Sequence, residues 1–93
     1  MRVPKTFQCG CRTWRVKFKK RLKHNDLGRC NHNKAMIYLR EDLKRDPELL
    51  LHTFMHELLH ATAGSMAWRR VDDDEHRLDA LAGLIAQAIS TSR

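Results

Sequence analysis

The stretch DPELLLHTFMHELLHATAG (residues 46–64) decides how this chain folds. Asp46 followed by Pro47 is typical of a helix start, because the Asp side chain can accept a backbone hydrogen bond and Pro fits the first helical position. Apolar or small residues then recur at intervals of three and four: Leu51, Phe54, Met55, Leu58, Leu59 and Thr62. Gly64 is a natural C-cap. The sequence therefore predicts a helix over 47–63, closed by Gly64.

This predicted helix carries two histidines four residues apart. Residues at that spacing lie one turn apart on the same face of a helix, so His56 and His60 aim their imidazoles at one point. Glu57, beside the first histidine, matches the general base of the H-E-x-x-H arrangement of zinc enzymes. Exposed or core-satisfied histidines are the alternative. The position in mid-helix, directly behind the buried stripe, favours a zinc site with one ion per chain.

A second helix is predicted over 72–90, behind the acidic start VDDDE (71–75). Its apolar residues are Leu78, Leu81, Ala82, Leu84, Ile85, Ala88 and Ile89. A catalytic zinc ion takes three protein ligands and keeps one open position, so a third ligand is needed. The candidates downstream are Asp72, Asp73, Asp74, Glu75, His76 and Asp79.

Helical geometry ranks these candidates. Glu75 and Asp79 fall on or beside the apolar stripe, whereas His76 is rotated by about 100° from Glu75. We therefore favour Glu75 as third ligand, with His76 as the alternative. Asp79, one turn later, is placed to accept a hydrogen bond from a ligand histidine. An acidic helix N-terminus without any metal would explain the same two carboxylates.

The N-terminal half, residues 1–46, has strand patterns. In TWRVKFK (13–19), apolar and basic residues alternate, which predicts a strand with one buried face. Gly10, between Cys9 and Cys11, predicts a hairpin turn, and AMIYLRE (35–41) predicts another strand. The Asn-, Asp- and Gly-rich segment 22–34 is typical of a loop. These patterns predict one α+β domain over 1–93, with a small antiparallel or mixed sheet packed on the histidine helix.

Positive charge is concentrated early in the chain, whose formal net charge is +7. The basic residues that we expect to face an acidic partner or nucleic acid are Arg12, Arg15, Lys17, Lys19, Lys20 and Lys23. A basic face is also a usual means of keeping an exposed strand soluble.

The sequence has no apolar run of the roughly 18 residues that a spanning helix needs, and its start lacks the apolar core of a secretion signal. We therefore expect a cytoplasmic protein without membrane contact. Cys9, Cys11 and Cys30, with His32, are candidates for a second zinc site, but their one-residue spacings favour ordinary thiols. His52 is one turn before His56. Three ligands on consecutive turns of one helix would span about 11 Å, so His52 is interpreted as a surface histidine.

The stretch HTFMHELLHA (52–61), followed by DDDEHRLDALAGLIAQAI (72–89), resembles the zinc metallopeptidases of the gluzincin type. The whole chain resembles small phage-encoded metallopeptidase-like proteins related in outline to the ImmA/IrrE group, in which a basic hairpin and a strand precede the metal helix. The resemblance implies a minimal zincin-like fold. It also implies that the protein acts in the cytoplasm of the host cell. It also implies the following roles: His56, His60 and Glu75 as zinc ligands, Glu57 as catalytic base, and Asp79 as partner of a ligand histidine.

Two functions follow as hypotheses. The first is a zinc metallopeptidase that hydrolyses a peptide or protein substrate, with the strand near 35–41 aligning an extended peptide by edge pairing. The second is a non-catalytic binding protein that keeps zinc to hold its fold and contacts nucleic acid or an acidic protein through the basic strand.

Overall fold

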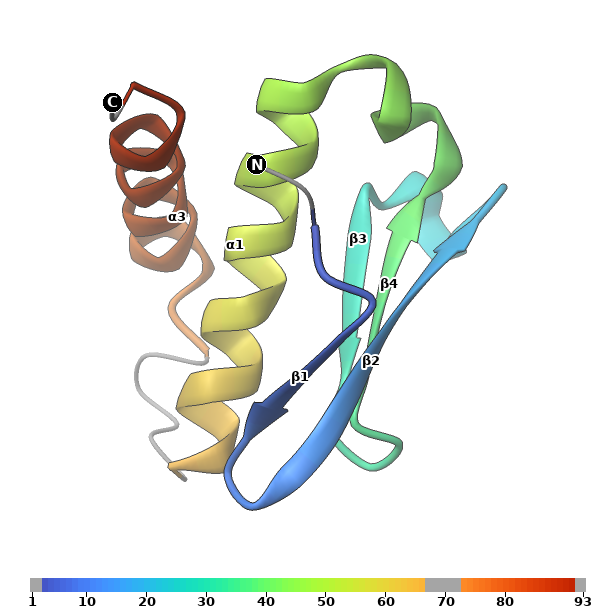
Figure 1. Ribbon diagram of the computed structural model, residues 1–93, viewed down its shortest axis with the longest axis vertical. Coiled ribbons are helices and arrows are strands. Elements are labelled where there is room, and N and C mark those ends of the chain that lie inside the picture. Colours follow the sequence, from blue (N-terminus) through green and yellow to red (C-terminus); the bar gives the residue numbers. More distant parts are fainter. Residues whose placement is uncertain (1–2, 67–72, 92–93) are drawn as a thin grey trace.

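A four-stranded mixed sheet and two long helices make up the fold in the computed structural model, which describes residues 3–66 and 73–91 (Figure 1). The strands are β1 (Thr6–Cys9), β2 (Arg12–Lys19), β3 (Gly28–Asn31) and β4 (Met36–Arg40). The helices are α1 (Pro47–Ser65) and α3 (Glu75–Thr91), with two short 3-10 helices, η1 (Lys23–Asn25) and η2 (Glu41–Arg45). The predicted α+β class is confirmed.

The sheet begins with the predicted hairpin. β1 and β2 pair antiparallel, with Cys9 opposite Arg12. The two residues between them, Gly10 and Cys11, both have left-handed backbone angles, with φ of 62° and 63°. A two-residue loop with positive φ at both positions matches the right-handed twist of a hairpin. A Cβ at residue 10 would also lie only 2.8 Å from Cβ of Ser65, so the turn lies against the end of α1.

The strand order is β1-β2-β4-β3, with β2 parallel to β4 and β3 antiparallel to β4. The strand expected over 35–41 is therefore confirmed as β4, but it is central, so the expectation that it pairs a peptide by its edge is wrong. The loop expected over 22–34 is also wrong in part, because this segment contains η1 and β3. β3 has no apolar alternation, and its pairing with β4 makes it a strand.

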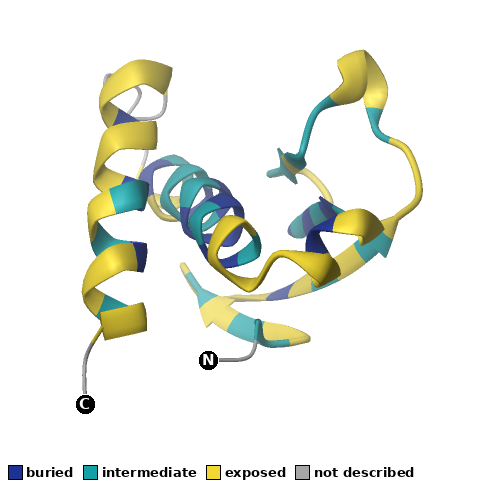
Figure 2. Cartoon of the chain, turned by 90° about the horizontal axis from the view of Figure 1, so that it is seen from above, coloured by how far each residue is buried: buried dark blue, intermediate teal, exposed yellow. Residues whose placement is uncertain are grey.

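α1 lies between the sheet and α3 (Figures 1 and 2). The inner face of the sheet supplies the fully buried Trp14, Ile37 and Leu39. The buried apolar residues of the two helices are Leu51, Phe54, Met55, Ala61, Ala63, Leu78, Ala82 and Ala86. The expected apolar stripes are corrected at four positions: Thr62, Leu81, Leu84 and Ala88 are exposed, whereas Ala61, Ala82 and Ala86 are buried.

The helix ends follow the sequence only in part. The Asp46 side chain accepts a hydrogen bond from the Leu49 backbone N–H at 3.2 Å, as expected of an N-cap. α1 does not stop at Gly64, however, but continues to Ser65 with Met66 as C-cap. Gly64 instead allows the His32 ring to pack against α1, because a Cβ at this position would collide with that ring. α3 begins at Glu75 rather than at residue 72, and Asp74 caps it.

Neither α1 nor α3, nor any other helix within 3–66 and 73–91, is long and apolar enough to cross a membrane.

Candidate metal centre

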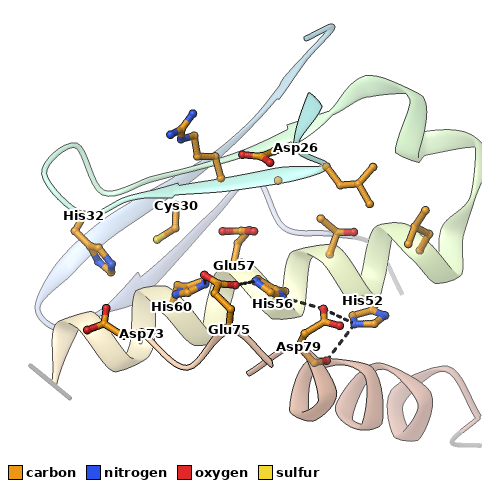
Figure 3. A pocket seen from close by; sticks show the side chains of 15 residues that line it. Asp26, Cys30, His32, His52, His56, Glu57, His60, Asp73, Glu75 and Asp79 are labelled. Carbon is orange, nitrogen blue, oxygen red and sulfur yellow. Dashed lines mark hydrogen bonds and ion pairs between the residues drawn. The ribbon is translucent and has the colours of Figure 1, made fainter. Parts of the chain in front are cut away.

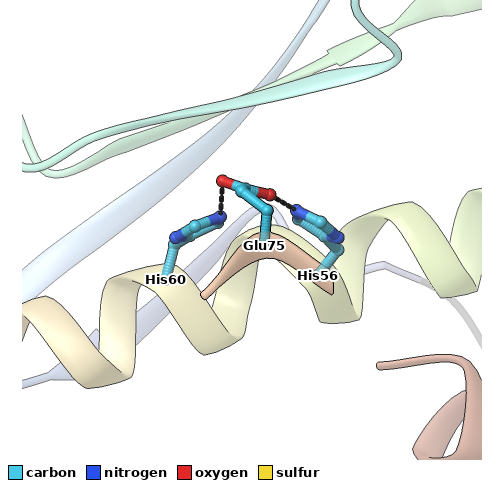
Figure 4. A group of neighbouring side chains, drawn as sticks. All are labelled: His56, His60 and Glu75. Atoms are coloured by element: carbon cyan, nitrogen blue, oxygen red, sulfur yellow. Dashed lines mark hydrogen bonds and ion pairs between the residues drawn. The ribbon is translucent and has the colours of Figure 1, made fainter. Parts of the chain in front are cut away.

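The two helices bring three predicted ligands together. His56 and His60 lie on one face of α1, and Glu75 reaches them from the first turn of α3 (Figure 4). Its carboxylate spans both imidazoles: Oε2 is 2.9 Å from Nε2 of His56, and Oε1 is 2.8 Å from Nε2 of His60. One donor atom from each of the three residues lies within 4.8 Å of the others.

This donor set suits zinc. Two imidazole nitrogens and one carboxylate oxygen are a ligand set of known catalytic zinc sites, which leave the fourth position to water. Ligands about 2.1 Å from a tetrahedral zinc ion are roughly 3.4 Å apart. The observed separations of up to 4.8 Å therefore need only small side-chain movements to accommodate an ion. Glu75 is well exposed, with 66% of its side chain accessible, and has room to make that movement.

Asp79 fixes the orientation of His56. Its Oδ1 lies 3.0 Å from Nδ1 of His56, which donates the hydrogen bond (Figure 3). With the proton on Nδ1, the lone pair of Nε2 points at the Glu75 carboxylate, so a cation between the two would complete the arrangement. The hydrogen bond from His56 also holds the pKa of Asp79 below its ordinary value, with a smaller contribution from His52.

His52 is not the surface histidine that the sequence suggested. Its Nε2 lies 3.2 Å from both Oδ1 and the backbone oxygen of Asp79. Its ring packs between the helices at Gly83, where a Cβ would come within 3.2 Å of Cε1. The sequence held a signal for this contact in two spacings of four residues. His52 and His56 are one turn apart on α1, and Asp79 and Gly83 are one turn apart on α3. His52 thus belongs to the support of the site, although it does not belong to the group of three ligands.

Glu57 is buried beside the ligands. Only 7% of the residue is exposed, and β3 lies directly against it, since a Cβ at Gly28 would be 3.0 Å from Cγ of Glu57. Burial disfavours the ionised carboxylate and raises the pKa of Glu57 to about 7, although His56 and His60 act in the opposite direction. A carboxyl group with a pKa near neutrality is suited to accepting and returning a proton.

The other candidates for third ligand lie elsewhere. His76 is exposed and Asp74 caps α3, so neither joins the three converging residues. Asp73 lines the cavity beside them, and Asp72 lies outside the described residues. Within the described chain, His56, His60 and Glu75 are the one group of His, Cys, Asp and Glu side chains with metal-binding spacing.

The cysteines form no disulfide, and the Cys9 S–H donates a hydrogen bond to Oγ of Ser65 at 3.6 Å. The described residues do not gather Cys9, Cys11, Cys30 and His32 into a second group of that kind. His32 packs edge-on against Trp14, at 5.8 Å between ring centres.

A cavity of about 750 Å³ opens over the three ligands (Figure 3). α1 and the start of α3 form one side, and the edge strand β3 with the preceding loop forms the other. Cys30 and His32 line it opposite His60. Its lining residues run from His52 at one end to Asp73 and His32 at the other, with Glu57 between them (Figure 3).

Comparisons of the chain with protein-family models, with curated proteins and with solved structures find no match. Its function must therefore be inferred from the residues of the site.

Proposed function

We propose that this protein is a zinc-dependent peptidase, with His56, His60 and Glu75 as metal ligands and Glu57 as general base. One observation carries the proposal: three ligand atoms within 4.8 Å of one another lie next to the carboxyl group of Glu57, a residue that is only 7% exposed. The resemblance of the sequences HTFMHELLHA and DDDEHRLDALAGLIAQAI to gluzincin-type metallopeptidases suggests the same roles.

When bound, a zinc ion would supply a Lewis acid that polarises the peptide carbonyl and acidifies a water molecule. Glu57, buried beside the ligands, would accept the proton of that water and deliver it to the leaving amine. Asp79 keeps the proton of His56 on Nδ1 and leaves Nε2 available. β3 and α1 keep Glu57 largely out of bulk water, which strengthens its interactions with charges that develop during the reaction.

The edge strand β3 is the part of the site best suited to holding a substrate. It pairs with β4 on one side only, and its residues Gly28 and Cys30 line the cavity over the ligands. An extended peptide could add to this edge through main-chain hydrogen bonds, which would carry a scissile bond past Glu57. The proposed substrate is therefore an unfolded or extended segment of a protein.

A purely structural zinc site is the rival explanation, and two observations weigh against it. A structural site closes all four positions with protein ligands, whereas the described residues offer three. Burial of Glu57 next to the ligands is costly for a carboxylate and serves no purpose in a structural site.

The test is Glu57→Gln, which removes the base and preserves the shape of the side chain. Zinc-loaded wild type and variant are incubated with a proteome-derived peptide library, and new termini are identified by mass spectrometry. We expect cleavage by the wild type and a loss of about 10²- to 10⁴-fold in the variant, with zinc retained. Glu48→Gln, in the exposed first turn of α1, is the matched control. Equal cleavage by both variants, or no cleavage by zinc-loaded wild type, would contradict the proposal.

A further inference from the structure

The sheet has one face that α1 covers and one that the described helices leave open (Figures 1 and 2). Strand register shows which residues share the open face. Lys17 on β2 stands opposite Tyr38 on β4, and Tyr38 stands opposite Arg29 on β3. The neighbouring row holds Arg15 and Met36, and Lys19 lies next to Tyr38 with its ammonium 4.5 Å from the ring centre. Residues directly opposite each other point to the same side of a sheet, so these cations surround one aromatic ring.

Charge is separated between the two sides of the molecule. The exposed cations of the open face are Arg15, Lys17, Lys19 and Arg29. None of the four strands contains an acidic residue. By contrast, the carboxyl groups of Asp26, Glu57, Asp73, Glu75 and Asp79 line the cavity on the other side of β3. The strands themselves therefore offer no carboxyl group to pair with these four cations.

Two of the basic side chains are already occupied. Arg12 donates to the backbone oxygens of His32 and Asn33 and so fastens the β3–β4 turn. Arg40 pairs with Asp42 at 2.6 Å. Arg12, which the sequence suggested as a partner-binding residue, therefore holds the β3–β4 turn, whereas Arg15, Lys17 and Lys19 remain candidates for contact with a partner.

We propose that this open face binds single-stranded nucleic acid, with the four cations on phosphates and Tyr38 as a stacking platform for a base. A basic surface interleaved with an aromatic ring is the usual composition of such sites. An anionic membrane fits less well, because membrane-surface binding also needs apolar residues that insert. The exposed large apolar residues, Leu49, Met66, Leu81 and Leu84, belong to the helical side instead. This activity does not depend on the metal.

The test measures binding of a fluorescent single-stranded oligonucleotide by anisotropy over a range of salt concentrations. Four phosphate contacts predict a slope of log affinity against log salt of roughly −3. Arg15→Glu with Lys17→Glu should weaken binding by at least about tenfold and reduce the slope by roughly 1.4. Tyr38→Leu should weaken binding by about tenfold and leave the slope unchanged.

The matched control is Arg45→Glu with Arg77→Glu, which makes the same change in net charge on the exposed helical side. Thermal melts verify that each variant is folded. If the variant with both Arg15→Glu and Lys17→Glu does not fold, Lys17→Gln provides a milder change. Unchanged binding by the control supports the assignment. Equal losses in both double variants would overturn it, because attraction would then depend on net charge alone. Binding to phosphatidylserine vesicles without binding to the oligonucleotide would also overturn it.

Discussion

Oδ1 of Asp79 lies 3.0 Å from Nδ1 of His56 and 3.2 Å from Nε2 of His52, so one carboxylate of α3 joins two consecutive turns of α1 (Figure 3). Through this contact the packing of the helices determines how a ligand histidine is oriented. Asp79→Ala should therefore weaken zinc affinity by about 10- to 100-fold while the three ligands remain. Competition with a chromophoric chelator measures the effect. Asp73→Ala, at the cavity but outside the hydrogen-bonded group, should change affinity little.

His52 should act through Asp79 and not on the metal itself. His52→Leu removes the hydrogen bond to Asp79 but keeps an apolar side chain against Gly83. We expect zinc affinity to fall by several-fold, less than with Asp79→Ala, because His56 still has its partner. The variant that combines both substitutions should bind zinc no more weakly than Asp79→Ala alone. Additive losses in the combined variant would show that His52 acts by another route.

Gly28 allows β3 to lie against the proposed base. A Cβ at this position would be 2.9 Å from Cγ2 of Thr53 and 3.1 Å from Oε2 of Glu57. Gly28→Ala should therefore destabilise the fold by about 1–3 kcal/mol and lower peptidase activity, with little effect on zinc affinity. Denaturant titration and chelator competition measure the two properties. Gly83→Ala, whose nearest neighbour would be 3.2 Å away, should be much milder. Equal destabilisation by the two variants would refute this account of Gly28.

Burial of Glu57 should make the metal-free protein less stable as the pH rises. Its pKa is about 7, above the ordinary 4.5, so the folded state binds this proton more tightly than the unfolded state. The cost is absent below about pH 4.5, grows as the pH rises to about 7, and is constant above that. Between about pH 5 and pH 8, Glu57→Gln should gain up to about 3 kcal/mol in free energy of unfolding relative to the wild type. Glu48→Gln is the control, and a pH-independent difference would contradict the prediction.

The sequence was most informative where a periodic pattern extended over many residues. The alternation in 13–19 and the three- and four-residue spacing in 46–64 predicted β2 and α1. The four-residue spacing of His56 and His60, with the place of Glu75 beside the apolar stripe of the second helix, predicted three side chains that converge. These patterns depend on local geometry, which neighbouring residues determine.

Features that depend on contacts between distant segments were missed. β3 has only four residues and becomes a strand because β4 lies beside it. Gly64 matched a helix end by residue type, but its actual role depends on His32, which is remote in sequence. His52 was interpreted without knowledge of the helix that packs over it. The sequence predicted Asp79 as partner of a ligand histidine, but it did not predict the second contact of Asp79, with His52.

The most direct test of the central claim is the zinc content of protein purified without chelator and then supplied with zinc, measured by elemental analysis. His76→Ala provides the matched control for Glu75→Ala, because His76 is the adjacent residue and lies outside the converging group. We predict one zinc ion per chain in the wild type and in His76→Ala, and a clear loss in Glu75→Ala. No zinc in the wild type, or full retention in Glu75→Ala, would contradict the proposed centre.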